Sequence, residues 1–143
     1  MADFTAYLSF DGNCTEAMRF YERVLNGKLI ALLTNGQTPA AEHVPPGNED
    51  RIMHACLVCD GFTLMAGDSL IGKPYQKMQG FHLTLTYKDV AEAQRVFEGL
   101  SEGGEVQMPF EPTFWAERFG MLVDRYGTPW IVNGGEAPAE ATA

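Results

Sequence analysis

The strongest constraint on the fold of this chain is an internal repeat. Residues 4–10, FTAYLSF, are similar to residues 81–87, FHLTLTY, and a helix-like segment follows each of them. The strand segments are offset by 77 positions and the helices by 76, so one loop residue accounts for the difference. A duplicated unit predicts two half-domains, and the cleft between the copies is the expected place for function.

Each copy begins with a strand and a helix. Apolar and polar side chains alternate along residues 4–10, which is typical of a half-buried strand. Asn13 and Glu16 form an N-cap and N3 pair, which predicts a helix to about residue 25 that ends at a left-handed Gly27. The repeat pairs Gly27 with Gly103. The helix is expected to pack on Phe4, Leu8 and Phe10.

The remaining strands complete two βαβββ modules. Asp60-Gly61 is a two-residue hairpin signal, and its register pairs Cys56 with Met65. The proline-containing segment 35–50 is expected to be a long exposed loop. Tyr126-Gly127 predicts the matching turn of the second module. Further strands are predicted at 28–34, 51–59 and 62–67 in the first module, and at 105–108, 119–125 and 128–133 in the second, whose helix starts at Asp89.

These elements predict one α+β domain built from two tandem βαβββ modules. The modules are expected at residues 1–75 and 76–134, and the Ala-, Pro- and Glu-rich tail at 135–143 is expected to be disordered. Three cysteines are present, and Cys56-x-x-Cys59 lies inside a predicted strand. Thioredoxin-like cysteine pairs open a helix instead, so these thiols are expected to be small core residues without disulfides.

Charge excludes several classes of partner. The formal net charge is -9 and the isoelectric point is near 4.6, so phosphate backbones and anionic lipids are repelled. No apolar run approaches the roughly 18 residues of a membrane-spanning helix. The N-terminal residues, with Asp3 and no basic region, do not read as a signal peptide. The expected partners exclude nucleic acid and membrane, and the expected compartment is the cytoplasm.

Three segments carry a resemblance to a known family. YLSFDGNC, MHACLVCDGFTLMAGD and TFWAERFGMLVDRYGTPWIVN resemble the PhnB-like group of the vicinal-oxygen-chelate superfamily, which includes glyoxalase I and bleomycin-resistance proteins. The resemblance implies strands that curl around a shared cleft with the helices outside, and it implies a homodimer. Members of the group often carry the name 3-demethylubiquinone methyltransferase. This chain, however, lacks a glycine-rich strand-to-helix turn that would hold a methyl-donor nucleotide.

The resemblance also implies where a metal would bind. Metal-dependent members place one ligand on the first strand and one on the last strand of each module. Those positions correspond here to Thr5, Met65, His82 and Ile131. Only His82 is a good ligand for a catalytic divalent metal, which usually needs at least three imidazole, carboxylate or thiolate ligands. No cofactor is therefore expected, and a displaced site that uses His54, His82 and Asp68 or Glu117 is the alternative.

Other side chains on the predicted cleft face are candidates for binding or catalysis. If Met65 faces the cleft, His54 and Cys56 do too. His54 and His82 are the candidate acid, base or hydrogen-bond groups, and each could equally be a structural histidine. Asp68 could orient His54 or could be an ordinary turn aspartate. The predicted apolar lining consists of Tyr7, Met65, Trp115, Leu122 and Ile131.

Residues 113–120, TFWAERFG, place aromatic side chains in a loop that would normally be polar. Trp115 could stack on a planar ligand, and Arg118 could pair with a carboxylate. The alternative is that Glu117 and Arg118 pair with each other and Trp115 fills the core. Trp130 is predicted to be a core residue, because it alternates away from Ile131.

Three functions remain open. The first is the binding of a small organic molecule in an apolar cleft without the usual metal, with His54 and His82 as polar anchors. The second is a metal-dependent lyase, isomerase or dioxygenase with a nonstandard ligand set. The third is a dimer of the resistance type that sequesters a drug. The sequence favours the first.

Overall fold

The computed structural model describes residues 2–135, so the prediction for the tail lies outside the described residues apart from Gly135. The chain separates into two compact units, Met1–Gln76 and Lys77–Ala143. Each unit contains one helix and one four-stranded sheet. The α+β fold with two βαβββ modules, predicted from the repeat, is confirmed.

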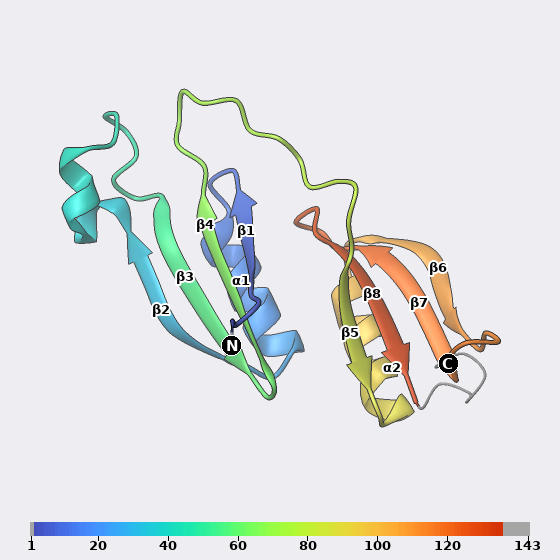
Figure 1. Ribbon diagram of the computed structural model, residues 1–143. Coiled ribbons are helices and arrows are strands. Elements are labelled where there is room, and N and C mark those ends of the chain that lie inside the picture. The colour runs from blue at the N-terminus through green and yellow to red at the C-terminus, as the bar shows by residue number, and fades with distance from the viewer. Residues whose placement is uncertain (1, 136–143) are drawn as a thin grey trace. The chain divides into compact units, whose positions relative to one another are not determined.

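The first unit forms a mixed sheet in the order β1-β4-β3-β2 (Figure 1). β1 pairs with β4 in parallel, and the other two pairings are antiparallel. Cys56 faces Met65 across β3 and β4, as the hairpin signal predicted. The elements are β1 (Ala6–Phe10), α1 (Cys14–Val24), β2 (Lys28–Thr34), β3 (Ile52–Cys59) and β4 (Phe62–Asp68).

The second unit repeats this topology in the order β5-β8-β7-β6 (Figure 1). β6 is longer than predicted and includes Pro109, which an edge strand tolerates because one side of it needs no ladder hydrogen bonds. The elements are β5 (Leu83–Tyr87), α2 (Val90–Ser101), β6 (Glu105–Glu111), β7 (Arg118–Val123) and β8 (Pro129–Gly134).

Helix α1 covers one face of the first sheet. Leu8 and Phe10 are buried on that face, and the Phe10 ring lies 6.5 Å from the ring of Tyr21 in α1. Phe4, which was predicted to share this packing, is fully exposed because it precedes the first residue of β1. Tyr7 therefore belongs to the opposite, open face, since neighbouring residues of a strand point to opposite sides.

Helix α2 covers the second sheet in the same way. A Cβ atom at Gly120 would lie 2.5 Å from Phe97 of α2, and one at Gly134 would lie 2.9 Å from Ala93. Trp130 is 1% exposed on this helix-covered face, so its assignment to the core is confirmed.

Leu122 lies in the same core, which corrects its predicted place in the cleft lining. It is fully buried, and it pairs with Trp130 while Met121 pairs with Ile131. The cause is the turn, which is longer than predicted: the Asp124 side chain accepts hydrogen bonds from the backbone N–H groups of Tyr126 and Thr128. A register shift of one residue moves each side chain to the other face of a sheet.

The segment between β2 and β3 is largely exposed, as predicted, and contains local structure. It contains two short 3-10 helices, Asn35–Gln37 and Pro39–Glu42. Asn35 and Asn48 are buried, and the Asn35 amide donates to the carbonyl of Asn48. The Asn48 side chain in turn accepts from the backbone N–H of Ile71. Buried amides thus satisfy the backbone of this loop.

The two helices end on equivalent pairs of residues. Asn26 adopts the left-handed conformation, with φ 57°, while a Cβ atom at Gly27 would lie 2.7 Å from the Cys59 sulfur. Gly103, with φ 76°, and Gly104 repeat this pair after α2. Gly27 is therefore required for a close approach and not for a left-handed turn, and its structural counterpart is Gly104 rather than the predicted Gly103.

Candidate functional site

The open face of the first sheet carries a row of adjacent side chains from three strands. Tyr7 of β1 pairs with Met65 of β4, and Met65 pairs with Cys56 of β3. Cys59 faces the helix side, where its sulfur approaches Gly27. His54 and Cys56 therefore point to the open face, because they alternate with the side chains of β3 that α1 covers. The structure brings together four of the predicted site residues on this face.

The Tyr7 and His54 rings are stacked on this face. Their centroids are 6.1 Å apart and their planes differ by 23°. The Tyr7 hydroxyl donates to the carbonyl of Met53 at 2.9 Å, and Gly67 leaves space for that hydroxyl. Burial, with a smaller effect from Cys14, raises the pKa of Tyr7, so the phenol stays protonated at neutral pH.

Asp68 has a structural role instead of the predicted contact with His54. Its Oδ1 atom accepts hydrogen bonds from the backbone N–H groups of Gly12 and Cys14, at 2.9 and 3.0 Å. Its Oδ2 atom accepts from the N–H of Ile52 at 2.8 Å. This carboxylate joins β4 to the start of α1 and to the start of β3. Of the two alternatives for Asp68, the structural one therefore holds, and Asp68 stabilises two segments rather than one turn.

A shallow hollow of about 450 Å³ lies at one end of the first unit. It includes Met65 and Thr5, two of the positions that the family resemblance implied for metal ligands. Its volume falls in the range of about 300–1,000 Å³ that is usual for small-molecule sites. The residues around it are Asp3, Phe4, Thr5, Cys59, Gly61, Phe62, Thr63 and Met65.

The open face of the second sheet has a polar side and an apolar side. Thr84 and Thr86 of the edge strand β5 lie next to Ile131 and Asn133 of β8. The Asn133 amide donates to the Thr86 hydroxyl at 3.3 Å. Across β8 lie Met121 and Phe119 of β7, which pair with Ile131 and Asn133.

His82 spans this face by a hydrogen bond. Its Nε2 atom lies 3.0 Å from Oε1 of Gln107, and because an amide oxygen only accepts, the imidazole donates. His82 directly precedes β5 and Gln107 lies in β6, and these strands are the two edges of the sheet. The bond therefore joins opposite edges over β8 and β7.

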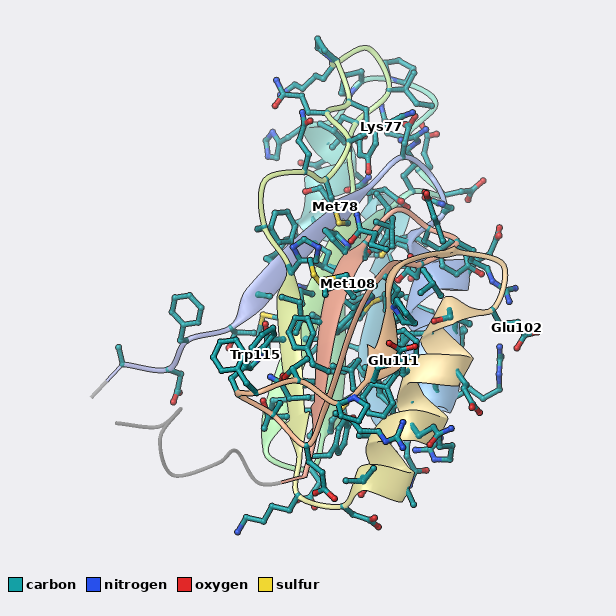
Figure 2. All side chains as sticks on the ribbon, turned by 90° about the vertical axis from the view of Figure 1, so that its right-hand side faces the viewer. Lys77, Met78, Glu102, Met108, Glu111 and Trp115 are labelled. Carbon is teal, nitrogen blue, oxygen red and sulfur yellow. The ribbon has the colours of Figure 1, made fainter. Side chains whose placement is uncertain are left out.

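Trp115 lies on the side of the sheet opposite α2 (Figure 2). Its ring makes edge-to-face contacts with Phe119, at 5.2 Å between centroids, and with Phe114, at 4.8 Å. Phe114 is 83% exposed. Trp115 is half-buried and does not fill the core, so this aromatic residue lies beside the open face.

The predicted pairing of Glu117 with Arg118 does not form within residues 2–135. Arg118 instead donates to the carbonyl of Phe110 at 3.4 Å, in the neighbouring strand β6. Glu117 is exposed and lies against Gly135. A ligand role for either residue stays a prediction.

The donors at the four implied metal positions do not fit a catalytic divalent metal. In the first unit they are the Thr5 hydroxyl and the Met65 thioether. In the second unit Ile131 offers no donor atom, and the His82 imidazole is already hydrogen-bonded to Gln107. Divalent ions of this class prefer imidazole, carboxylate or thiolate ligands. Residues 2–135 contain no cluster of three or more His, Cys, Asp and Glu side chains that could hold a metal.

All three thiols are buried, and two of them have raised pKa values. Burial, together with the nearby charge of Asp68, raises the pKa of Cys14 to about 12, and burial raises the pKa of Cys59 to about 11. All three cysteines are free. Cys56 and Cys59 lie on opposite faces of the sheet, so they are not placed as a redox pair.

Gln107, Phe119 and Asn133 are site residues that sequence reasoning missed. The alternation of β8 that assigned Trp130 to the core also puts Asn133 on the same face as Ile131, so a signal for Asn133 was present. Gln107 contacts His82 across 25 residues and two intervening strands, and no local pattern indicates such a contact.

Comparison with known proteins agrees with this fold. Solved structures of a glyoxylase/bleomycin resistance protein/dioxygenase domain from Frankia and of a fosfomycin resistance protein from Listeria monocytogenes share it at 13% and 14% identity, and that likeness shows the fold alone. The two modules therefore have the glyoxalase/bleomycin-resistance fold. More particularly, the chain belongs to the family described as 3-demethylubiquinone-9 3-methyltransferase, whose profile matches residues 2–133.

More similar proteins agree with the PhnB-like resemblance. The chain is 44% identical to PA1353 of Pseudomonas aeruginosa, with a TM-score of 0.88 over 95% of this chain and 99% of that one. It is 25% identical to a putative 3-demethylubiquinone-9 3-methyltransferase, PhnB protein, of Bacillus cereus, with a TM-score of 0.78 over 94% and 100% of the two chains. It is 35% identical to the protein YjdN of Escherichia coli, over 89% and 91% of the two sequences. Within residues 2–135, no helix has the length and apolar character to cross a membrane.

Proposed function

We propose that this chain binds a small, planar organic molecule on the open face of its second sheet, without the metal centre of the superfamily. One observation carries the proposal: a polar column and an apolar column lie side by side on that face. Thr84, Thr86 and Asn133 offer hydrogen bonds, while Phe119 and Met121 offer apolar contact. Ligand sites usually combine an apolar lining with a few placed polar groups.

Trp115 and His82 bound this face and suggest how a ligand would be held. The exposed side of the Trp115 ring would stack on a planar molecule, because its edge contacts with Phe119 fix its orientation. His82 would exchange its bond with Gln107 for a bond to the ligand, or would keep that bond and close one end of the face. Either arrangement excludes water from the apolar column.

The test is a fragment screen by thermal shift, followed by titration of the hits against Trp115 fluorescence. Trp115→Phe identifies the signal, since the other tryptophan, Trp130, is buried in the core. Thr86→Val is expected to weaken binding about tenfold, because it removes one ligand hydrogen bond at constant shape. Thr63→Val in the first unit is the matched control. Hits that bind both threonine variants as tightly as the unchanged chain would contradict the proposal.

Direct metal analysis distinguishes metal-free ligand binding from the metal-dependent alternative. Protein purified without chelator is titrated with zinc, nickel, manganese and ferrous iron. We expect substoichiometric binding, because the donor set at the inherited positions does not fit these ions. A stoichiometric divalent metal that is lost on His82→Ala would overturn metal-free binding and favour lyase, isomerase or dioxygenase chemistry.

The methyltransferase activity in the family description is not part of the proposal. Both strand-to-helix turns use their backbone N–H groups internally: Asp68 occupies those of Gly12 and Cys14, and Asp89 accepts from Ala91. A nucleoside methyl donor would thus find these donors already taken.

We also propose a homodimer, as the family resemblance suggests. Apolar side chains on the open side of the first sheet support it, because Leu33 and Val58 are about two-fifths exposed. Sedimentation equilibrium at micromolar concentration tests it, and a monomer there would contradict it. Drug sequestration and a cytoplasmic location stay predictions.

A further inference from the structure

The open face of the first sheet gathers three soft metal donors that the proposed function does not use. Cys56 and Met65 are direct partners across β3 and β4. Side chains in that relationship have Cβ atoms about 5 Å apart, which lets a thiol and a thioether converge on one ion. His54 precedes Cys56 by two residues on the same face, at a spacing of about 7 Å along the strand.

The state of these donors favours a ligand role. Neither ring nitrogen of His54 forms a hydrogen bond or ion pair within residues 2–135, and the Cys56 sulfur has no such contact there either. The stacked Tyr7 ring restricts the His54 imidazole, at 6.1 Å between centroids. Cys56 is 6% exposed, and Met65, its partner across the sheet, lines the hollow of about 450 Å³.

Donor chemistry selects the ion. Thiolate and thioether sulfurs prefer soft cations such as Cu(I), and a thioether is a poor ligand for zinc, manganese or magnesium. Met65 stands where the family resemblance places a ligand for a hard metal. Residues 2–135 contain no metal-binding cluster of three His, Cys, Asp or Glu side chains, and this arrangement reaches three donors only through a methionine.

We propose that His54, Cys56 and Met65 form a binding site for Cu(I). On binding, Cu(I) replaces the thiol proton of Cys56, the proton leaves to solvent, and no electron is exchanged. Met65 supplies its thioether and His54 one imidazole nitrogen, which gives a three-coordinate site. The site lies wholly in the first unit, so its test and the test of organic-ligand binding on the second sheet have independent outcomes.

The experiment is an anaerobic titration of the full, reduced chain with Cu(I), in competition with the chromogenic chelator bicinchoninate. We expect one Cu(I) per chain. Cys56→Ser is expected to abolish binding, and Met65→Leu and His54→Ala each to weaken the apparent affinity by about tenfold or more. Met108→Leu, at an exposed methionine in β6 of the second unit, and Cys59→Ala are the matched controls and should bind as the unchanged chain does.

Separate measurements test whether the variants fold and whether the site prefers soft cations. Met65→Leu conserves volume and should keep the circular dichroism spectrum and melting temperature, so its loss of affinity reports the thioether. Silver(I), which is redox-inert here, should shift amide NMR signals of β3 and β4 in the unchanged chain. Binding retained in Cys56→Ser, binding equal in Met65→Leu and His54→Ala to that of the unchanged chain, or displacement of Cu(I) by equimolar zinc would each overturn the proposal.

Discussion

The Asp68 carboxylate accepts a hydrogen bond from the backbone N–H of Cys14 at 3.0 Å, across 54 positions of sequence. Asn13 occupies the N-cap position of α1, yet its side chain forms no capping bond. The last residue of β4 thus satisfies the start of the helix. An anionic group at a helix N-terminus also interacts favourably with the helix dipole.

Asp68→Ala is expected to lower the free energy of unfolding by about 3 kcal/mol, because it leaves three backbone N–H groups without their acceptor. Asn13→Ala is the matched control, and we expect a change within about 0.5 kcal/mol, since no capping bond is lost. Urea unfolding followed by circular dichroism measures both. An Asn13 variant as destabilised as the Asp68 variant would show that capping is local after all.

Local sequence patterns predicted the fold well, because strand alternation and the two-residue turn determine which face a side chain occupies and which residues pair. Alternation placed Tyr7 on the open face of the first sheet, and the Asp60-Gly61 turn set the pairing of Cys56 with Met65. Pairing in a two-residue hairpin follows from the turn itself. The same method failed at Leu122, because the second hairpin has a longer turn built around the Asp124 side chain.

The candidate sites were less predictable because they depend on distant contacts. The use of Asp68 as a helix cap and the bond between His82 and Gln107 both join segments that no periodicity connects. Sequence alone supplied the residue types, and it could not supply their partners. The open face of the second sheet became visible as a site only when Phe119 and Asn133 were placed next to each other.

The close contacts at Gly27 and at its counterpart Gly104 predict that alanine destabilises the chain at both positions. Gly27→Ala and Gly104→Ala are each expected to destabilise the chain by about 1–3 kcal/mol, because a Cβ atom at either site meets strand backbone at too short a distance. Asn26→Gly should be neutral within about 1 kcal/mol, since glycine adopts its left-handed conformation readily. Thermal unfolding of the three variants measures this. Tolerance of alanine at Gly27 but not at Gly104 would argue against their structural equivalence.

The Cys14 thiol should make stability depend on alkaline pH. Its pKa is about 12 in the folded chain, against 9.0 for a free cysteine. Between pH 9 and 12 the unfolded chain loses this proton while the folded chain keeps it, so stability falls as the pH rises. Unfolding midpoints in urea from pH 8 to 11 should drop less steeply in Cys14→Ala than in the unchanged chain. Parallel pH profiles would contradict the raised pKa of the buried thiol.

The position of the Tyr7 ring should depend on the absence of a side chain at Gly67. A Cβ atom there would lie 2.7 Å from the Tyr7 hydroxyl oxygen and 3.0 Å from the Met53 carbonyl oxygen. Gly67→Ala should therefore break the hydrogen bond between Tyr7 and Met53 and move the ring away from His54, which changes the NMR shifts of the imidazole protons.

A double-mutant cycle with Tyr7→Phe isolates the steric cause. Tyr7→Phe removes the hydroxyl and keeps the ring, so Gly67→Ala should cost less free energy in that background, by about 0.5–1.5 kcal/mol. The difference would show that the tyrosine hydroxyl, and not only the Met53 carbonyl, requires glycine at position 67. Additive effects in the cycle, with unchanged imidazole shifts in Gly67→Ala, would mean that the Tyr7 ring is held by the sheet alone, and the fixed stack against His54 would lose its physical basis.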